Sequence, residues 1–176
     1  MSEYNLNTEN INEWVHSLKA GDRVNLSGVI FTARDAAHKR IVSIIRDGGK
    51  LPFEIEGSVV YYAGPTPAKN GLAIGSIGPT TSSRMDTFSP LLVSLGQKAM
   101  IGKGNRSAEV IEAMKEHGAV YFAAVGGAGA LYSECIEKCE VIAFEDLGCE
   151  SVKSLTVKNF PLIVAIDSEG NSLYNK

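Results

Sequence analysis

The chain has 176 residues, of which 44% are hydrophobic and 21% are charged, which is ordinary for one globular domain. Its formal net charge of -3 lacks the strong basic excess of most nucleic-acid-binding domains, so no nucleic-acid partner is expected. No apolar run approaches the roughly 18 residues that a membrane helix needs. The first ten residues are polar and acidic, unlike a secretion signal. These properties predict a cytoplasmic protein with no membrane partner.

The first predicted element is an amphipathic helix over residues 8–19, with Ile11, Trp14, Val15 and Leu18 on one face. Alternating apolar residues then predict a strand over 22–33. The remaining predicted helices, which end at glycine or begin near proline, cover 34–48, 85–96, 106–118 and 129–138. The remaining predicted strands cover 57–68, 71–78, 98–104, 119–127, 139–146, 152–160 and 161–174, the last with a hairpin turn at 168–171.

Strands and helices alternate in the middle of the chain, and strands cluster at both ends. This order predicts an α/β fold with a mixed sheet rather than a purely parallel one. We expect residues 1–19 to form an N-terminal helical arm and residues 20–176 to form a single domain.

Four predicted strand-to-helix junctions carry polar or glycine-rich sequences: FTARDAAHKR, GPTTSSRMD, IGKGNRS and VGGAGAL. In α/β sheets, ligands bind at such junctions, where helix N-termini offer free N–H groups and partial positive charge. Arg34, Arg84 and Lys103 add cations there, which is unfavourable unless an anion binds. Since guanidinium groups match carboxylates, the pattern favours a small di- or tricarboxylate ligand.

Each signal has a simpler alternative. Arg34 can pair with Asp35 or another carboxylate, and Lys103 can be a solvated turn residue. The GGAGA run can serve close helix packing, and it matches neither dinucleotide nor Walker A patterns. His38 lies one turn after Arg34, either as a proton shuttle or as a core or surface histidine.

Cys135, Cys139 and Cys149 are the only cysteines. Their spacing matches no ferredoxin pattern, which favours structural thiols over a metal site in this chain. No metal ligand is therefore assigned here.

Several strings occur together in one order: FTARDAAHKR, GPTPA, GPTTSSRMD, GKGN, GGAGAL and NFPLIVAIDSEGNSLY. In this combination the chain resembles the β subunit, or C-terminal domain, of class I iron–sulfur fumarate hydratases. The related L(+)-tartrate dehydratase β subunit shares the pattern. The similarity extends from about residue 23 to residue 174.

The resemblance implies a swivelling β/β/α domain, similar to the mobile domain of aconitase. It implies a hydro-lyase that is active only with an α subunit, in an αβ heterodimer or its dimer. Three cysteines of that α subunit would hold a [4Fe–4S] cluster, whose open iron site binds substrate oxygens as a Lewis acid. The reaction would be the hydration of fumarate to L-malate, with L(+)-tartrate and mesaconate as open alternatives for the substrate.

The resemblance also implies residue roles. Arg34, Arg84 and Lys103 would bind substrate carboxylates, with further contacts from Thr81, Ser82 and Asn105. Thr80 would be the base that moves the C–H proton, assisted by Arg84 and Lys103. Because aconitase's domain uses a serine in a Ser-Ser-Arg loop, Ser82 is the alternative base. A non-catalytic dicarboxylate-binding module and a purely structural domain are the alternatives from other functional classes.

Overall fold

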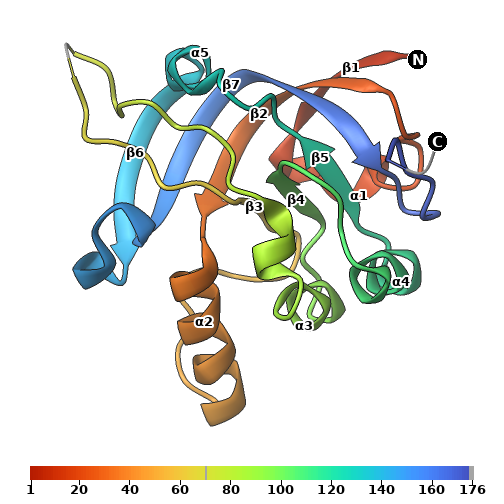
Figure 1. Cartoon of the computed structure of the whole chain (residues 1–176), viewed down its shortest axis with the longest axis horizontal. Helices are drawn as coiled ribbons and strands as arrows, with labels where there is room; N and C mark the ends of the chain where they lie inside the picture. The colour runs from red at the N-terminus through yellow and green to blue at the C-terminus, as the bar shows by residue number, and fades with distance from the viewer. Residues whose placement is uncertain (70, 175–176) are drawn as a thin grey trace.

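The computed structural model describes residues 1–69 and 71–174, and Figure 1 shows its elements. The strands are β1 (Glu3–Asn7), β2 (Arg23–Thr32), β3 (Val59–Tyr61), β4 (Ala99–Gly102), β5 (Val120–Ala123), β6 (Ile136–Ala143) and β7 (Val152–Ile166). The α-helices are α1 (Ile11–Trp14), α2 (Asp35–Asp47), α3 (Ser89–Ser94), α4 (Ala108–His117) and α5 (Gly129–Glu134). Three short 3-10 helices are η1 (Thr8–Asn10), η2 (Ser82–Met85) and η3 (Glu145–Glu150).

The strands form one mixed sheet, which confirms the predicted α/β class. Strands β2, β3, β4 and β5 are parallel neighbours in that order. The long strand β7 runs antiparallel to both β2 and β5, so these five strands close a circuit of paired strands. Strand β1 extends the sheet beside β2, and β6 extends it beside β7.

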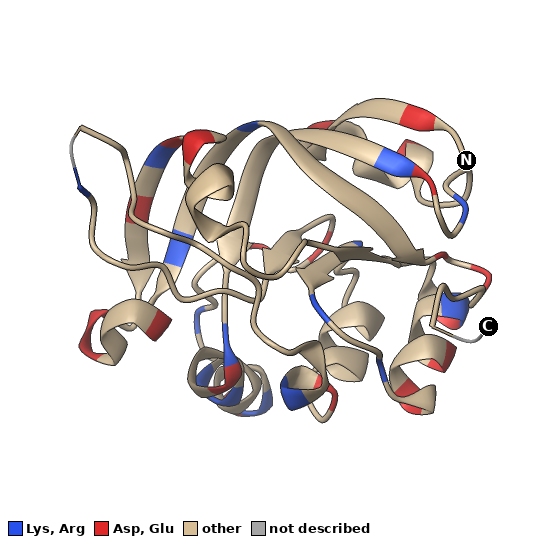
Figure 2. Ribbon diagram, turned by 45° about the horizontal axis from the view of Figure 1, so that its top comes forward, with Lys and Arg blue, Asp and Glu red and all other residues tan. Residues whose placement is uncertain are grey.

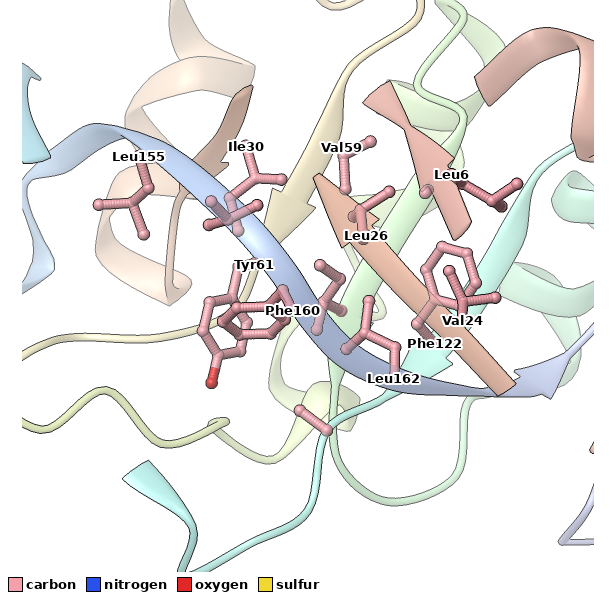
Figure 3. Packing of buried hydrophobic residues seen from close by; sticks show 14 of the residues in the cluster. Leu6, Val24, Leu26, Ile30, Val59, Tyr61, Phe122, Leu155, Phe160 and Leu162 are labelled. Atoms are coloured by element: carbon pink, nitrogen blue, oxygen red, sulfur yellow. The ribbon is translucent and has the colours of Figure 1, made fainter. Parts of the chain in front are cut away.

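Alternation along the parallel strands divides the apolar residues between two cores. Val59 and Tyr61 of β3 belong to one cluster, which Figure 3 shows filled from β2, β3, β5 and β7. Val60, between them, belongs to a second cluster. Helices α2, α3 and α4 cover that second cluster on the same side of the sheet (Figure 1). Both cores hold the strand ends in place, and the candidate site lies at these ends.

The N-terminal region differs from the predicted 8–19 helix. Strand β1 pairs in parallel with β2, and helix α1 covers only Ile11–Trp14. The Asn7 side chain accepts a hydrogen bond from Glu9 N, and this cap begins a 3-10 turn instead of a regular helix. The predicted apolar residues are nevertheless buried, with Ile11, Val15 and Leu18 in the first core. Strand β1 belongs to the same sheet as the rest of the chain. The division of the chain at residue 19 stays a prediction.

The C-terminal strands also differ from prediction. The two expected strands, 152–160 and 161–174, form one continuous strand, β7. Asn159 adopts a positive φ of 51°, and its N–H bonds the Ser27 hydroxyl, so the strand bends there without ending. The predicted turn is present, with Gly170 N donating to Asp167 O. By contrast, the predicted strand over 71–78 is absent from the described part of that segment, which leaves a long loop before the site.

Charged residues lie mainly on the helices, on the turns and along the outer strands, as Figure 2 shows. Among residues 1–69 and 71–174, every helix is too short or too polar to span a bilayer.

Candidate functional site

The predicted junctions meet at one edge of the sheet. Arg34 follows β2, Gly64 follows β3, Lys103 follows β4 and Val125 follows β5. Because these four strands are parallel and adjacent, their carboxyl ends lie side by side, where α/β proteins bind ligands. Three of the four predicted junctions, at Arg34, Lys103 and Val125, therefore follow parallel strands at this edge, whereas GPTTSSRMD lies near the end of the long loop after β3. A shared binding location stays a prediction.

The loop that carries Thr80 is fixed between two of these strand ends. Thr80 N donates to Tyr62 O at 2.6 Å, just beyond β3. Lys103 N donates to Thr80 O at 3.4 Å, and Ser82 N donates to Lys103 O at 2.9 Å. The half-buried Thr80 thus lies beside the Lys103 backbone.

The two predicted arginines reach the same carboxylate. Arg84 Nη2 lies 2.6 Å from Asp35 Oδ2, and Arg34 Nε lies 4.0 Å from Asp35 Oδ1. Arg34 Nε is also 3.5 Å from Glu150 Oε1. Arg34 therefore pairs with acidic side chains, as the simpler alternative predicted. It also shares Asp35 with Arg84.

Lys103 differs from the arginines in its surroundings. Its side chain is exposed, and no ion pair to it is found within residues 1–69 and 71–174. A methyl group added at Gly126 would lie 3.7 Å from Lys103 Cδ, so the lysine stem passes close to the glycine-rich loop. At Gly129 of that loop, an added Cβ would lie 2.9 Å from Gly78 N. Gly129 thus serves close packing against the loop that carries Thr80, rather than the packing of a helix on a strand that the simpler interpretation expected.

Ser82 lies beneath the loop rather than on its exposed side. Its side chain is fully buried, with Oγ 2.9 Å from the Tyr121 hydroxyl. Tyr121 donates its own proton to Gly104 O, so Ser82 donates to Tyr121. This bond occupies the Ser82 hydroxyl and leaves Thr80 as the more available oxygen. Thr81 and Asn105 are both exposed beside the same strand ends.

Arg106 is a neighbouring residue that sequence reasoning missed. Its guanidinium is buried, 2.8 Å from Asp86 Oδ1 and 2.7 Å from Ser89 Oγ, and it stacks over the rings of Tyr62 and Tyr121. Burial alone lowers the pKa of Arg106, but these tyrosines and Asp86 raise it overall, so the group stays charged. Arg106 stands three residues after Lys103 in the predicted IGKGNRS junction, which marked it as a possible site residue. Its burial, however, cannot be predicted from this spacing.

His38 lies in the second core, which favours the interpretation as a core histidine. Nδ1 is 2.9 Å from Arg34 O, so Nδ1 carries the proton, because a carbonyl only accepts. Nε2 is buried without a hydrogen-bond partner. Burial is the main cause that lowers the pKa of His38 to about 4, and the charge of Arg106 acts in the same direction.

His38 predicts an acid-sensitive stability. The pKa of His38 falls from its ordinary 6.5 to about 4 in the fold, so the unfolded chain binds more protons between these two pH values. The His38 contribution, about 3 kcal/mol, is complete above pH 6.5 and is lost as pH falls toward 4. Urea unfolding between pH 7 and 4 should show this slope, reduced in His38→Gln and kept in the exposed-site control His16→Gln. Equal slopes in wild type and His38→Gln would contradict the assignment.

The cysteines support the structural interpretation. Cys135 and Cys139 are half-buried against the first core, and burial raises the pKa of both thiols, whereas Cys149 is exposed. Within residues 1–69 and 71–174, no three or more His, Cys, Asp or Glu side chains group to hold a metal ion.

Comparison with known proteins identifies the family. A family model described as "Fumarase C-terminus" matches residues 1–176. A "Putative L(+)-tartrate dehydratase subunit beta" from Methanocaldococcus jannaschii is 42% identical over 168 residues, covering 92% of this chain and 86% of that protein. "Fumarate hydratase 2" from Leishmania major is 37% identical over 170 residues, covering 96% of this chain and 30% of that protein. "Fumarate hydratase class I, anaerobic" from Escherichia coli is 38% identical over 156 residues, covering 88% and 28% respectively.

The chain spans less than a third of the length of these two fumarate hydratases but most of the tartrate dehydratase subunit. The match to the family model extends over the same residues that form the sheet and its four junctions. The chain belongs to the fumarase C-terminus family.

Proposed function

We propose that the chain is the β subunit of a two-chain hydro-lyase acting on a small dicarboxylate, with fumarate and L-malate as the first candidate pair. The observation that carries this proposal is the arrangement of Arg34 and Arg84 around one carboxylate, beside the Thr80 loop and at the strand ends. Membership of the fumarase C-terminus family supports the same reaction class.

The proposed binding roles follow from charge and exposure. Arg84 and Arg34 bind substrate carboxylate oxygens, since a guanidinium can donate two parallel N–H bonds to one carboxylate. Lys103 contributes an exposed ammonium without an acidic partner among the described residues. Thr81 and Asn105 are the further exposed contacts, and the buried Ser82 supports the loop from below.

Thr80 is the proposed base. In dehydration, the ionised Thr80 Oγ1 takes a proton from the carbon next to a carboxylate while the hydroxyl on the adjacent carbon leaves as hydroxide, a departure that the α-subunit cluster would assist as a Lewis acid. In hydration, both groups return. Negative charge then develops on that carboxylate, where the fixed cations stabilise it. A threonine hydroxyl is a weak base, so the same cations must also stabilise its ionised form. The backbone bonds of Thr80 to Tyr62 and Lys103 hold it in place for this transfer.

A partner chain completes the proposed enzyme. Most of the M. jannaschii relative, named a subunit beta, is matched by this chain, which supports a separate α subunit here. We propose that three α-subunit cysteines hold a [4Fe–4S] cluster, because two of the three cysteines of this chain pack against its own first core. The assembly is an αβ heterodimer or its dimer, with this chain as a swivelling domain similar to the mobile domain of aconitase. The same relative makes L(+)-tartrate the second substrate candidate.

Co-expression tests the two-chain proposal. When this chain is co-expressed with a candidate α chain that carries three candidate cluster cysteines, the two should purify as a brown, oxygen-sensitive complex with hydro-lyase activity. If the chains never associate and no activity appears, the proposed enzyme function is wrong, and a carboxylate-binding module or a structural domain is the better assignment.

Arg84→Lys should lower turnover of the complex at least about tenfold, equivalent to about 1.4 kcal/mol of barrier. Lysine keeps the charge but loses the planar fork that matches a carboxylate. Steady-state kinetics should show this loss in Arg84→Lys and wild-type rates in Arg40→Lys, which alters an exposed Arg–Asp pair elsewhere. A wild-type rate in Arg84→Lys would remove Arg84 from the site.

A further inference from the structure

We propose that Asp35 is a positioning residue, whose carboxylate fixes the guanidinium of Arg84 before substrate binds. This inference deepens the proposed function and rests on it. Asp35 is the first residue of α2, and Arg84 lies in η2, so their contact joins two segments of the candidate site.

The Asp35–Arg84 contact is short and leaves the arginine accessible. Arg84 Nη2 donates to Asp35 Oδ2 at 2.6 Å, a short hydrogen bond between two charged groups. The Arg84 side chain is nevertheless 48% exposed. A guanidinium has five N–H donors, so Asp35 can set its orientation while other donors remain for a substrate carboxylate.

Arg34 is held differently. Its Nε lies between Asp35 Oδ1 at 4.0 Å and Glu150 Oε1 at 3.5 Å. All three of these atoms are buried and lack a hydrogen-bond partner. Unsatisfied buried polar atoms cost free energy and are rare. Here, two of them are carboxylate oxygens beside the third, Arg34 Nε. Among residues 1–69 and 71–174, Arg34 Nε is therefore stabilised by charge without a hydrogen bond, whereas Arg84 Nη2 is oriented by one.

The charges of this group predict opposing effects on binding and on turnover. The two arginines and the two carboxylates sum to zero, and Lys103 adds one positive charge, so a dicarboxylate dianion approaches a site whose arginine charges are already compensated. Asp35 repels that dianion in the ground state but holds Arg84 where charge develops in the transition state. Its removal should therefore strengthen substrate binding and weaken catalysis, since only transition-state interactions raise turnover.

Asp35→Asn in the co-purified complex tests this prediction, because it removes the charge at nearly constant size. We expect kcat to fall at least about tenfold and KM to fall about two- to fivefold as the repulsion is lost. Asp146→Asn is the matched control, since it alters an exposed Arg–Asp pair away from the site. An unchanged kcat, or a higher KM, in Asp35→Asn overturns the inference while wild-type activity preserves the proposed function.

A second measurement needs neither partner nor turnover. In the ¹⁵N-labelled full chain, NMR exchange should show slow rotation of the Arg84 guanidinium in wild type and Asp146→Asn, and faster rotation in Asp35→Asn. Equal rotation rates in all three proteins overturn the positioning role. An inactive wild-type complex would reject the proposed function, and this measurement would still decide whether Asp35 fixes Arg84.

Discussion

Replacement of Asp86 by alanine is expected to lower the free energy of unfolding by about 3–5 kcal/mol. Its carboxylate accepts hydrogen bonds from Arg106 Nε and from Ser107 N, both at 2.8 Å. The Arg106 side chain is 0% exposed, so losing Asp86 leaves a buried cation without its counter-ion. Urea unfolding of the isolated chain measures the change as a shift of the midpoint.

Asp146→Ala is the control for this prediction. Asp146 also pairs with an arginine, Arg40, but its side chain is 65% exposed. Solvent screens such a pair, so its loss should shift the urea midpoint far less than the loss of Asp86 does. Similar destabilisation by Asp86→Ala and Asp146→Ala would contradict the stabilising role of the buried Asp86–Arg106 pair.

Thr80→Val should lower kcat of the complex by about 10²–10⁴-fold, the usual contribution of a positioned acid or base. Valine keeps the branched shape and removes the hydroxyl, while the backbone bonds that anchor residue 80 remain available. Because Thr80 is not proposed to bind a carboxylate, KM should change little. Thr80→Ser, which restores a hydroxyl, should recover most of the lost turnover in the same assay.

Ser82→Ala separates the two candidate bases. Ser82 Oγ is buried and donates to Tyr121, so its removal should affect stability more than turnover. If Ser82→Ala abolishes turnover in a folded complex and Thr80→Val leaves it intact, Ser82 is the base and the assignment of Thr80 is wrong.

Local patterns predicted part of the middle of the fold, although the expected strand over 71–78 is absent among the described residues. Helix α4 begins after Ser107, whose hydroxyl caps Val110 N, and ends at Gly118 with a positive φ of 64°. Both signals lie in adjacent residues and are visible in the sequence. By contrast, β1 exists because it pairs with β2, and β7 continues past Asn159 because β2 pairs with it on both sides. Such non-local pairings leave no signal in the segment itself.

For the candidate site, the sequence predicted where the junctions lie but not which contacts their side chains make. The junctions were recognisable because glycines and cations follow strands, and parallel strands place their carboxyl ends together. The sequence did not reveal which carboxylate each arginine contacts, although Asp35 stands beside Arg34. It also did not distinguish the buried Arg106 from the exposed Lys103, because burial depends on packing from Tyr62 and Tyr121.

The measurement closest to the central claim is an anaerobic assay of the co-purified two-chain complex with L-malate, L(+)-tartrate and mesaconate as substrates. We expect the complex to add or remove water reversibly with at least one of these acids, and we expect no reaction with either chain alone. A stable, cluster-loaded complex that leaves all three acids unchanged would contradict it.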